Sequence, residues 1–438
     1  MLAELTELEH PDPVPEFVSL AAAAPWTLAE LVTDPNGQTG ALTAALLDVL
    51  VDLGHEAPTW DALVHRLRGD VFARTRGEAQ WIAFTGPRER RLFTLARAPR
   101  QRSVGHTPDS DTTTWLRAGA LQGVEVGDRW ALVGRANTTN EAIVEHVLLD
   151  RARLRLLDPS PTPPVPSAAF VAGLARRETV SITDSEAACT ALSTTLAESP
   201  WLRLDGAPTL AQARIEPGGD CTIHDIPLTN DPGAGLAPLR MTAGTDPAHI
   251  VELLEDRART RRLLAALSAP PQWTSPIRWS WGTLEPLEPL PERGARLSAD
   301  QRIWIRLDNP SRVPQHWYVQ VIFIDPFGRA WLLDGANTDG IQLGRRGSER
   351  VGERPGRPPG LSLAWAASSG ASKCALVFIA ANRPLQLGHL ARACPQASPA
   401  SPVHGLESHE DRYNRDGEML VRAWSSGRIE FDLFVKEP

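Results

Sequence analysis

The spacing of apolar residues predicts two helices near the start of the chain. Apolar side chains recur every three or four positions over residues 39–53 and again after Pro58, where Thr59 has the side chain of an N-cap residue. The expected buried stripe of the first helix is Leu42, Leu46, Val49, Leu50 and Leu53. The expected stripe of the second helix is Trp60, Leu63, Val64, Leu67 and Val71. Each helix therefore has a face that must pack against other parts of the protein.

Short apolar runs on either side of these helices predict two strands. Residues 17–24, bounded by prolines, are typical of a buried strand of about six residues, and residues 80–85 of a second strand. Residues 27–32 are expected to form a loop, and Asp34-Pro-Asn-Gly37 is typical of a tight turn. Two strands cannot cover two helices and their own edges, so we expect strands from elsewhere to complete this α/β layer.

The remainder of the chain is predicted to be rich in β-structure. Alternating apolar and polar residues with turn signals between them are typical of hairpins and sandwich strands. The expected boundaries are residues 1–100 for the α/β segment, 101–183 for a β-rich module, 184–270 for an α+β module, 271–392 for a β-sandwich-like domain, and 393–438 for a linker and C-terminal hairpin. The predicted fold class is an α/β fragment followed by β-rich and α+β accessory domains.

Three details of this scheme depend on polar residues. The polar stretch Arg100–Thr114 is expected to be a linker, and the C-terminal hairpin is expected to turn at Ser426-Gly427. A helix is expected over residues 247–267, with an apolar inner face. Its charged residues are expected to face solvent, namely Glu252, Glu255, Asp256, Arg257, Arg259, Arg261 and Arg262.

Composition limits the class of protein. The 438 residues are too many for one ordinary core and indicate two to four domains. Acidic residues outnumber basic ones by 53 to 45, and the net charge of −8 argues against a dedicated nucleic-acid-binding protein. All basic residues except Lys373 and Lys436 are arginines, and Ala, Gly and Pro are abundant. This bias is typical of a GC-rich bacterial genome, so the arginine excess alone is weak evidence for phosphate binding.

Cysteine usage and the N-terminal residues indicate a cytoplasmic protein. The four cysteines, Cys189, Cys221, Cys374 and Cys394, are widely spaced without a C-x-x-C pair, so we expect reduced thiols and no zinc site. The first ten residues are acidic and lack the basic start and apolar block of a signal peptide. The chain contains no apolar run of about 18 residues, so we expect no transmembrane helix. We expect no cofactor and no membrane or nucleic-acid partner.

A search for catalytic residues finds no convincing constellation. His224 follows Cys221 by three positions, but strand alternation would put the two side chains on opposite faces, so a buried structural thiol is the favoured interpretation. His404 and His409 lie in a linker without a metal-binding pattern, and no glycine-rich phosphate loop is present. Five tryptophans on the sandwich strands are interpreted as core packing rather than as a ligand groove: Trp279, Trp281, Trp304, Trp317 and Trp331.

Four short motifs follow one another in the first hundred residues. They are Val18-Ser-Leu-Ala-Ala-Ala-Ala24, Trp26-Thr-Leu-Ala-Glu30, Gly40-Ala-Leu-Thr-Ala-Ala-Leu-Leu-Asp-Val-Leu50, and Pro58–Arg68 followed by Gln80-Trp-Ile-Ala-Phe-Thr-Gly86. In order and spacing they resemble the C-terminal half of a bacterial caspase-like, metacaspase-type cysteine peptidase. The later pattern of Asn309-Pro-Ser311, Tyr318 and Ile324-Asp-Pro-Phe-Gly328 resembles more loosely the accessory region that follows the peptidase in this family.

The resemblance implies that the loop with Trp26, Thr27 and Glu30 borders the primary specificity pocket. Glu30 would then favour a basic substrate side chain, since a partly buried carboxylate pairs well with Arg or Lys. The alternative is that Glu30 caps or anchors the adjacent turn. Both interpretations are open at the level of sequence.

The chain lacks the residues that perform catalysis in this family. The catalytic pair is a histidine in a His-Gly element and a cysteine in an Asp-x-Cys element, both preceding the strand at residue 18, whereas His10 is not followed by glycine. A thiolate nucleophile needs a base within hydrogen-bond reach, so we expect no catalytic residue in this chain.

Three interpretations of the whole chain follow. It is the downstream part of a caspase-like peptidase that pairs with a large catalytic subunit and acts on a protein or peptide substrate. Alternatively, it is a catalytically dead pseudo-peptidase that acts by binding, or an unrelated β-rich adaptor.

Overall fold

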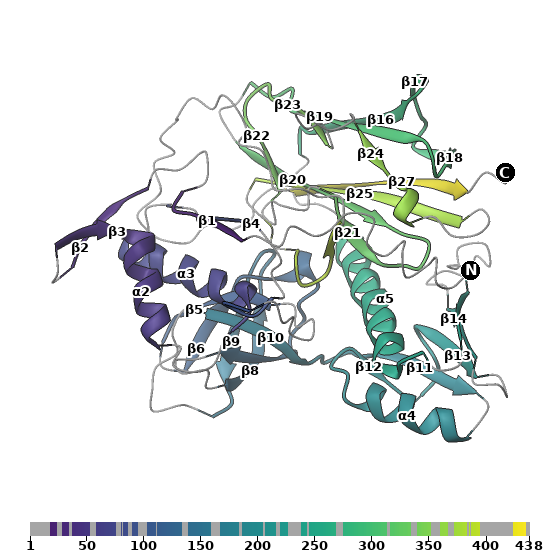
Figure 1. Ribbon diagram of the computed structural model, residues 1–438, viewed down its shortest axis with the longest axis horizontal. Helices are drawn as coiled ribbons and strands as arrows, with labels where there is room; N and C mark the ends of the chain where they lie inside the picture. The colour runs from purple at the N-terminus through teal and green to yellow at the C-terminus, as the bar shows by residue number, and fades with distance from the viewer. Residues whose placement is uncertain are drawn as a thin grey trace. The chain divides into compact units, whose positions relative to one another are not determined.

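The protein is mostly β-sheet, with several separate sheets and four α-helices among the described residues (Figure 1). The structure is a computed structural model that describes residues 18–94, 103–158, 167–394 and 424–434, with short gaps inside these ranges. The described residues form two compact units, one up to residue 172 and the other comprising 173–394 and 424–434. Within the described parts, every helix is too short or too polar to cross a lipid bilayer.

Both predicted N-terminal helices are present in the first unit. They are α2 (Ala41–Asp52) and α3 (Trp60–Arg74). The Ala62 N–H donates to Thr59 Oγ1 at 3.3 Å, so the predicted N-cap is confirmed. Residues of both predicted stripes share one core, which contains Ala41, Leu42, Ala45, Val49, Leu63, Leu67, Val71, Ile82 and Leu92.

The strands around these helices are shorter and more exposed than predicted. β1 (Ser19–Ala21) pairs antiparallel with β4 (Ala83–Thr85) in a two-stranded sheet. The prediction of a buried six-residue strand is wrong, because β1 has three residues and exposes Ser19 and Ala21. Part of the predicted loop is also a strand, β2 (Leu31–Asp34), which pairs with β3 (Gly37–Gly40) across the predicted turn.

A closed six-stranded barrel follows the α/β segment. Its strands are β5 (Ser103–Pro108), β6 (Thr113–Leu116), β7 (Arg129–Val133), β8 (Thr139–Val147), β9 (Ala152–Leu156) and β10 (Ser167–Gly173), in the order β10-β5-β6-β9-β8-β7. Alternate residues fill the interior; in β9, for example, residues 152, 154 and 156 are buried. The prediction of a linker over Arg100–Thr114 is wrong, because this stretch contains β5 and the start of β6.

The second unit begins with a five-stranded sheet covered by two helices. The strands are β11 (Glu178–Thr183), β12 (Leu202–Arg203), β13 (Ala211–Ile215), β14 (Cys221–Asp225) and β15 (Leu239–Met241), in the order β12-β11-β13-β14-β15. The helices are α4 (Glu186–Ala197) and α5 (Pro247–Leu267). β11 pairs with β12 and β13, so it belongs to this sheet and not to the barrel that precedes it in the chain.

Two further sheets form a sandwich. The smaller contains β17 (Leu287–Pro289), β16 (Arg278–Leu284), β19 (Arg302–Asp308) and β23 (Ser348–Val351) in that order, with β24 (Leu361–Ser362) also paired to β19. The larger has the order β18 (Arg293–Ser298), β27 (Trp424–Phe434), β25 (Ser372–Ala381), β20 (Trp317–Ile324), β21 (Ala330–Leu332) and β26 (Arg392–Ala393), with β22 (Ile341–Leu343) also paired to β20. Aromatic rings connect the two sheets; Trp279 stacks on Phe378 with centroids 5.1 Å apart.

The predicted C-terminal hairpin is wrong. Residues 424–434 form the single strand β27, which pairs with β25 from Trp424 to Leu433, including Ser426 and Gly427. Gly427 lies against the Trp279 ring, and a Cβ atom at this position would clash with it. The glycine therefore marks a close approach of a side chain to the strand rather than a turn.

α5 lies between the five-stranded sheet and the larger sheet of the sandwich (Figure 1). The Arg261 guanidinium donates to the Leu210 carbonyl at 3.2 Å on one side, and Arg257 Nε donates to the Phe327 carbonyl at 2.7 Å on the other. The prediction that the charged residues face solvent is wrong for Asp256, Arg257, Arg259 and Arg261, all of which are buried. Because sheets cover the helix on two sides, its polar side is buried as well as its apolar side.

Candidate functional site

Of the three residues predicted to border the substrate pocket, the structure describes only Glu30. Trp26 and Thr27 lie outside the described residues, whereas Glu30 is half-buried directly before β2. The Glu30 backbone N–H donates to Gln80 Oε1 at 2.8 Å, and its carbonyl accepts from the Ala41 N–H at 2.9 Å. The backbone of Glu30 is thus anchored on both sides, which fixes the point where the loop enters the hairpin.

Gln80 connects the two ends of this loop. Its Nε2 donates to the Ala22 carbonyl at 2.7 Å while its Oε1 accepts from the Glu30 N–H. The side chain is 6 % exposed, so both hydrogen bonds are shielded from water. From the sequence alone Gln80 is predicted only as part of a strand, because its partners Glu30 and Ala22 lie 50 and 58 positions away in the chain.

A polar cluster joins α3 to the first barrel strand. Ser103 Oγ donates to Asp61 Oδ2 at 2.5 Å, and His65 Nε2 lies 3.7 Å from Asp61 Oδ1. In a nucleophilic triad the histidine stands between the hydroxyl and the carboxylate. Here the carboxylate stands between the hydroxyl and the imidazole, so the order of the three groups is not that of a nucleophilic triad. The cluster holds α3 against β5.

Among the described residues of the α/β segment, the two-stranded sheet has unpaired edges and the outer face of α2 is exposed. The β1–β4 sheet has only two strands, so each strand has an unpaired edge within the described chain. On the solvent side of α2, Leu47 and Val51 are 58 % and 81 % exposed, and Leu31 on the neighbouring hairpin is 70 % exposed. An α-helix that is apolar on both sides is typical of one covered on both sides.

The described thiols are unsuited to nucleophilic catalysis. Cys221, Cys374 and Cys394 are buried, and burial, together with the charges of Asp325 and Asp432, raises the pKa of the Cys374 thiol far above its ordinary range. Along β14, Cys221 is buried and His224 is exposed, so the prediction that they occupy opposite faces is confirmed. Cys189 lies in α4, and nothing is described of its side chain.

The two motifs of the accessory region form turns. Asn309 Oδ1 accepts from the Ser311 N–H at 3.1 Å, and Asn309 Nδ2 donates to the Gly344 carbonyl at 2.8 Å. Asp325 is fully buried and accepts four hydrogen bonds, from the backbone N–H groups of residues 327 and 329, Arg329 Nε and the Trp331 indole. Both side chains use their capacity within the fold, so neither points to a ligand.

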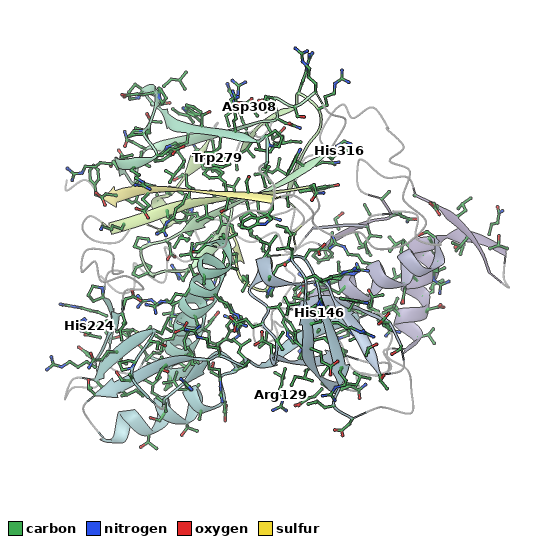
Figure 2. The ribbon with its side chains drawn as sticks, turned by 180° about the vertical axis from the view of Figure 1, so that it is seen from behind. Arg129, His146, His224, Trp279, Asp308 and His316 are labelled. Carbon is green, nitrogen blue, oxygen red and sulfur yellow. The ribbon has the colours of Figure 1, made fainter. Side chains whose placement is uncertain are left out.

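The tryptophans of the sandwich are in its core with one exception. Trp281, Trp317 and Trp331 are buried, and Trp279 packs between the two sheets, so the core interpretation is confirmed for these four (Figure 2). Trp304 instead lies on the outer side of β19 and is half-buried.

Comparisons with known proteins add no relative. No model of a known protein family matches the chain, and no curated protein matches it. Among the described residues, no group of three His, Cys, Asp or Glu side chains has a geometry that could hold a metal ion.

Proposed function

We propose that this chain is the C-terminal, small-subunit-like part of a bacterial caspase-like cysteine endopeptidase. It would supply the substrate-cleft loop and accessory domains to a large half that bears the catalytic histidine and cysteine. The observation that supports this proposal best is the open α/β layer, with its two-stranded sheet and the exposed apolar residues Leu31, Leu47 and Val51. Additional strands on the β1–β4 sheet and an apolar cover over α2 would remove both features.

In this proposal the loop with Trp26, Thr27 and Glu30 lines the primary specificity pocket. The two hydrogen bonds of the Gln80 side chain, to the Glu30 N–H and the Ala22 carbonyl, form a clamp on this loop. This Gln80 clamp supports such a role, because substrate-positioning groups need a fixed backbone. The Glu30 carboxylate then selects substrates with Arg or Lys at the cleavage site.

Co-expression with the coding segment immediately upstream tests the proposal. We expect a His/Cys-bearing polypeptide to co-purify with the full chain and the pair to cleave peptides after Arg or Lys, whereas this chain alone does not. The double variant Leu47→Glu/Val51→Glu should abolish co-purification. Leu287→Glu is the matched control, because Leu287 is 74 % exposed but lies on the sandwich.

Other results would favour the second candidate, an adaptor. An upstream segment without an Asp-x-Cys element, or a partner whose binding is unaffected by the double variant, would overturn the peptidase proposal. If the pair cleaves peptides, Glu30→Gln should reduce selectivity for Arg and Lys without preventing assembly.

A further inference from the structure

The outer face of the smaller sandwich sheet is rich in arginine. Alternate residues of β16, β19 and β23 face outward, while the residues between them face the core, except that Glu349 on the edge strand β23 is only half-buried. The outward residues are Arg278, Ser280, Gly282, Leu284, Arg302, Trp304, Arg306, Asp308, Ser348 and Arg350. Among the described residues of these three strands, four arginines and one carboxylate therefore share this face, in a protein with a net charge of −8. Figure 2 shows Asp308 on this outer side and Trp279 between the sheets.

The strand register places like charges beside each other. Arg306 lies directly opposite Arg350 in the β19–β23 pair, an arrangement that destabilises a sheet. Asp308 Oδ1 accepts from Arg306 Nε at 3.0 Å, and Asp308 also lies opposite Arg278 across the β16–β19 pair. Among the outward residues of these three strands, one carboxylate thus stands among four guanidinium groups.

The corner next to this face carries a strained arginine. Gly344-Arg-Arg-Gly347 leads into β23 and closes with a hydrogen bond from the Gly347 N–H to the Gly344 carbonyl at 3.0 Å. Arg346 has a φ of +53° and an exposed side chain, whereas glycine adopts this backbone conformation at no steric cost. Glycine and arginine codons are both GC-rich, so genome composition does not explain arginine at this position. The strain points to a use for the charge.

We propose that this arginine face, defined by Arg278, Arg302, Arg306, Arg346 and Arg350, binds an extended acidic segment of a partner protein. Guanidinium groups pair with carboxylates through two parallel hydrogen bonds. In an extended chain, alternate side chains point to one side about 7 Å apart, which suits a face built from neighbouring strands. This proposal is independent of the peptidase assignment.

Trp304 provides an apolar surface between the arginines. It lies opposite Gly282, which carries no side chain, and its indole Nε1 has no hydrogen-bond partner within the described chain. A single aromatic ring on this face is unlike the series of stacking platforms that single-stranded nucleic acids use. The acidic charge of the whole protein also opposes a polyanionic nucleic acid, so an acidic polypeptide is the favoured occupant.

Fluorescence anisotropy with the full chain tests the proposal. The probe is a labelled peptide of alternating glutamate and serine, which we expect to bind at low salt and to be released as salt rises. Arg306→Gln/Arg350→Gln should weaken binding by about tenfold or more. The matched control is Arg129→Gln/Arg155→Gln, which removes the same charge from exposed ion pairs of the barrel and should leave the affinity within about twofold of wild type.

Arg346→Gly separates binding from folding. It removes both a charge and the backbone strain, so we expect a higher melting temperature together with weaker peptide binding. The proposal is overturned if the wild-type chain does not bind the acidic peptide, or if the barrel control loses as much affinity as the arginine-face variant. It is also overturned if a lysine–serine peptide binds equally well, or if single-stranded oligonucleotides bind more tightly than the acidic peptide.

Discussion

His106 is a neutral imidazole built into the interior of the barrel. It is 2 % exposed, and its Nδ1 lies 3.1 Å from Thr114 Oγ1. Thr114 donates its only hydroxyl proton to the Thr107 carbonyl at 2.8 Å, so it accepts from His106 Nδ1–H. Burial lowers the pKa of His106 to about 4; the Val133 carbonyl opposes this shift, whereas the nearby positive charge of Arg117 adds to it.

The lowered pKa of His106 predicts acid sensitivity of the barrel. The unfolded chain binds the proton near the ordinary pKa of 6.5, whereas the folded chain binds it only near 4. The stabilisation is therefore complete above 6.5 and decreases as pH falls toward 4, by about 3 kcal/mol at most. His106→Asn keeps a donor for Thr114 but cannot titrate, so urea unfolding at several pH values should show a flatter dependence. His146→Asn, at an exposed site of the same barrel, should behave like wild type; an equally steep loss in His106→Asn would contradict the assignment.

Gln80 makes a second prediction at the residue scale. Gln80→Leu fills a similar volume but leaves the Glu30 N–H and the Ala22 carbonyl without their partner. We expect a cost of about 1–3 kcal/mol and faster hydrogen exchange of the Glu30 amide. Gln38→Leu is the control, because Gln38 is exposed on β3. Unchanged exchange at Glu30 in Gln80→Leu would show that the clamp does not hold the loop.

At the scale of elements, α5 is held between its neighbours by buried charges. Burial lowers the pKa of the Arg257 guanidinium, and the carboxylates of Asp225 and Asp325 oppose this shift. On the same helix, Arg259 bonds Glu255 at 2.8 Å and lies 4.8 Å from the Trp201 ring centroid. Such groups are tolerated in the interior because each charge is compensated by hydrogen bonds and opposite charges.

Asp325 is the position where this arrangement is most vulnerable. Asp325→Ala removes four accepted hydrogen bonds, including the ion pair with Arg329, and one of the two carboxylates that oppose the lowered pKa of Arg257. We expect a loss of about 3–5 kcal/mol, seen as a melting temperature lower by several degrees. Asp308→Ala serves as the comparison, because its ion pair with Arg306 is exposed and should contribute at most about 1 kcal/mol. Equal effects of the two substitutions would refute a central role for Asp325.

The elements differ in how far the sequence determines them. α2 and α3 could be predicted because their apolar spacing and the Thr59 cap are local signals. β5 could not be predicted from local signals. Its polar residue Ser103 is buried, and its hydroxyl bonds to Asp61, which lies 42 positions earlier in the chain. The charged side of α5 is predicted to face solvent because periodicity alone does not show that a second sheet covers it. In the candidate site, Glu30 could be predicted from the Trp26–Glu30 motif. The Gln80 clamp could not, because it depends on a contact between residues 50 positions apart.

At the scale of the whole molecule, strands near the two ends of the described chain differ in how many neighbouring strands they pair with. β25 and β27 lie inside a sheet and are paired on both sides, whereas β1 and β4 pair, among the strands that the structure describes, only with each other. A two-stranded sheet is at best marginally stable in water unless something covers it. If the α/β layer is half of a larger one, the isolated chain should hold this part of the fold only weakly.

Hydrogen exchange on the intact chain tests whether the β1–β4 sheet is less stable than the sheet that contains β25 and β27. We expect the amides of β1 and β4 to exchange far faster than those of β25 and β27, because local opening of a short open sheet costs little free energy. Addition of the upstream His/Cys-bearing polypeptide should protect β1, β4 and the exposed side of α2, and leave β25 and β27 unchanged. The Leu47→Glu/Val51→Glu variant should lose this protection, whereas Leu287→Glu should retain it. Strong protection of β1 and β4 in the chain alone would mean that the layer is already complete, which would remove the main support for a missing half.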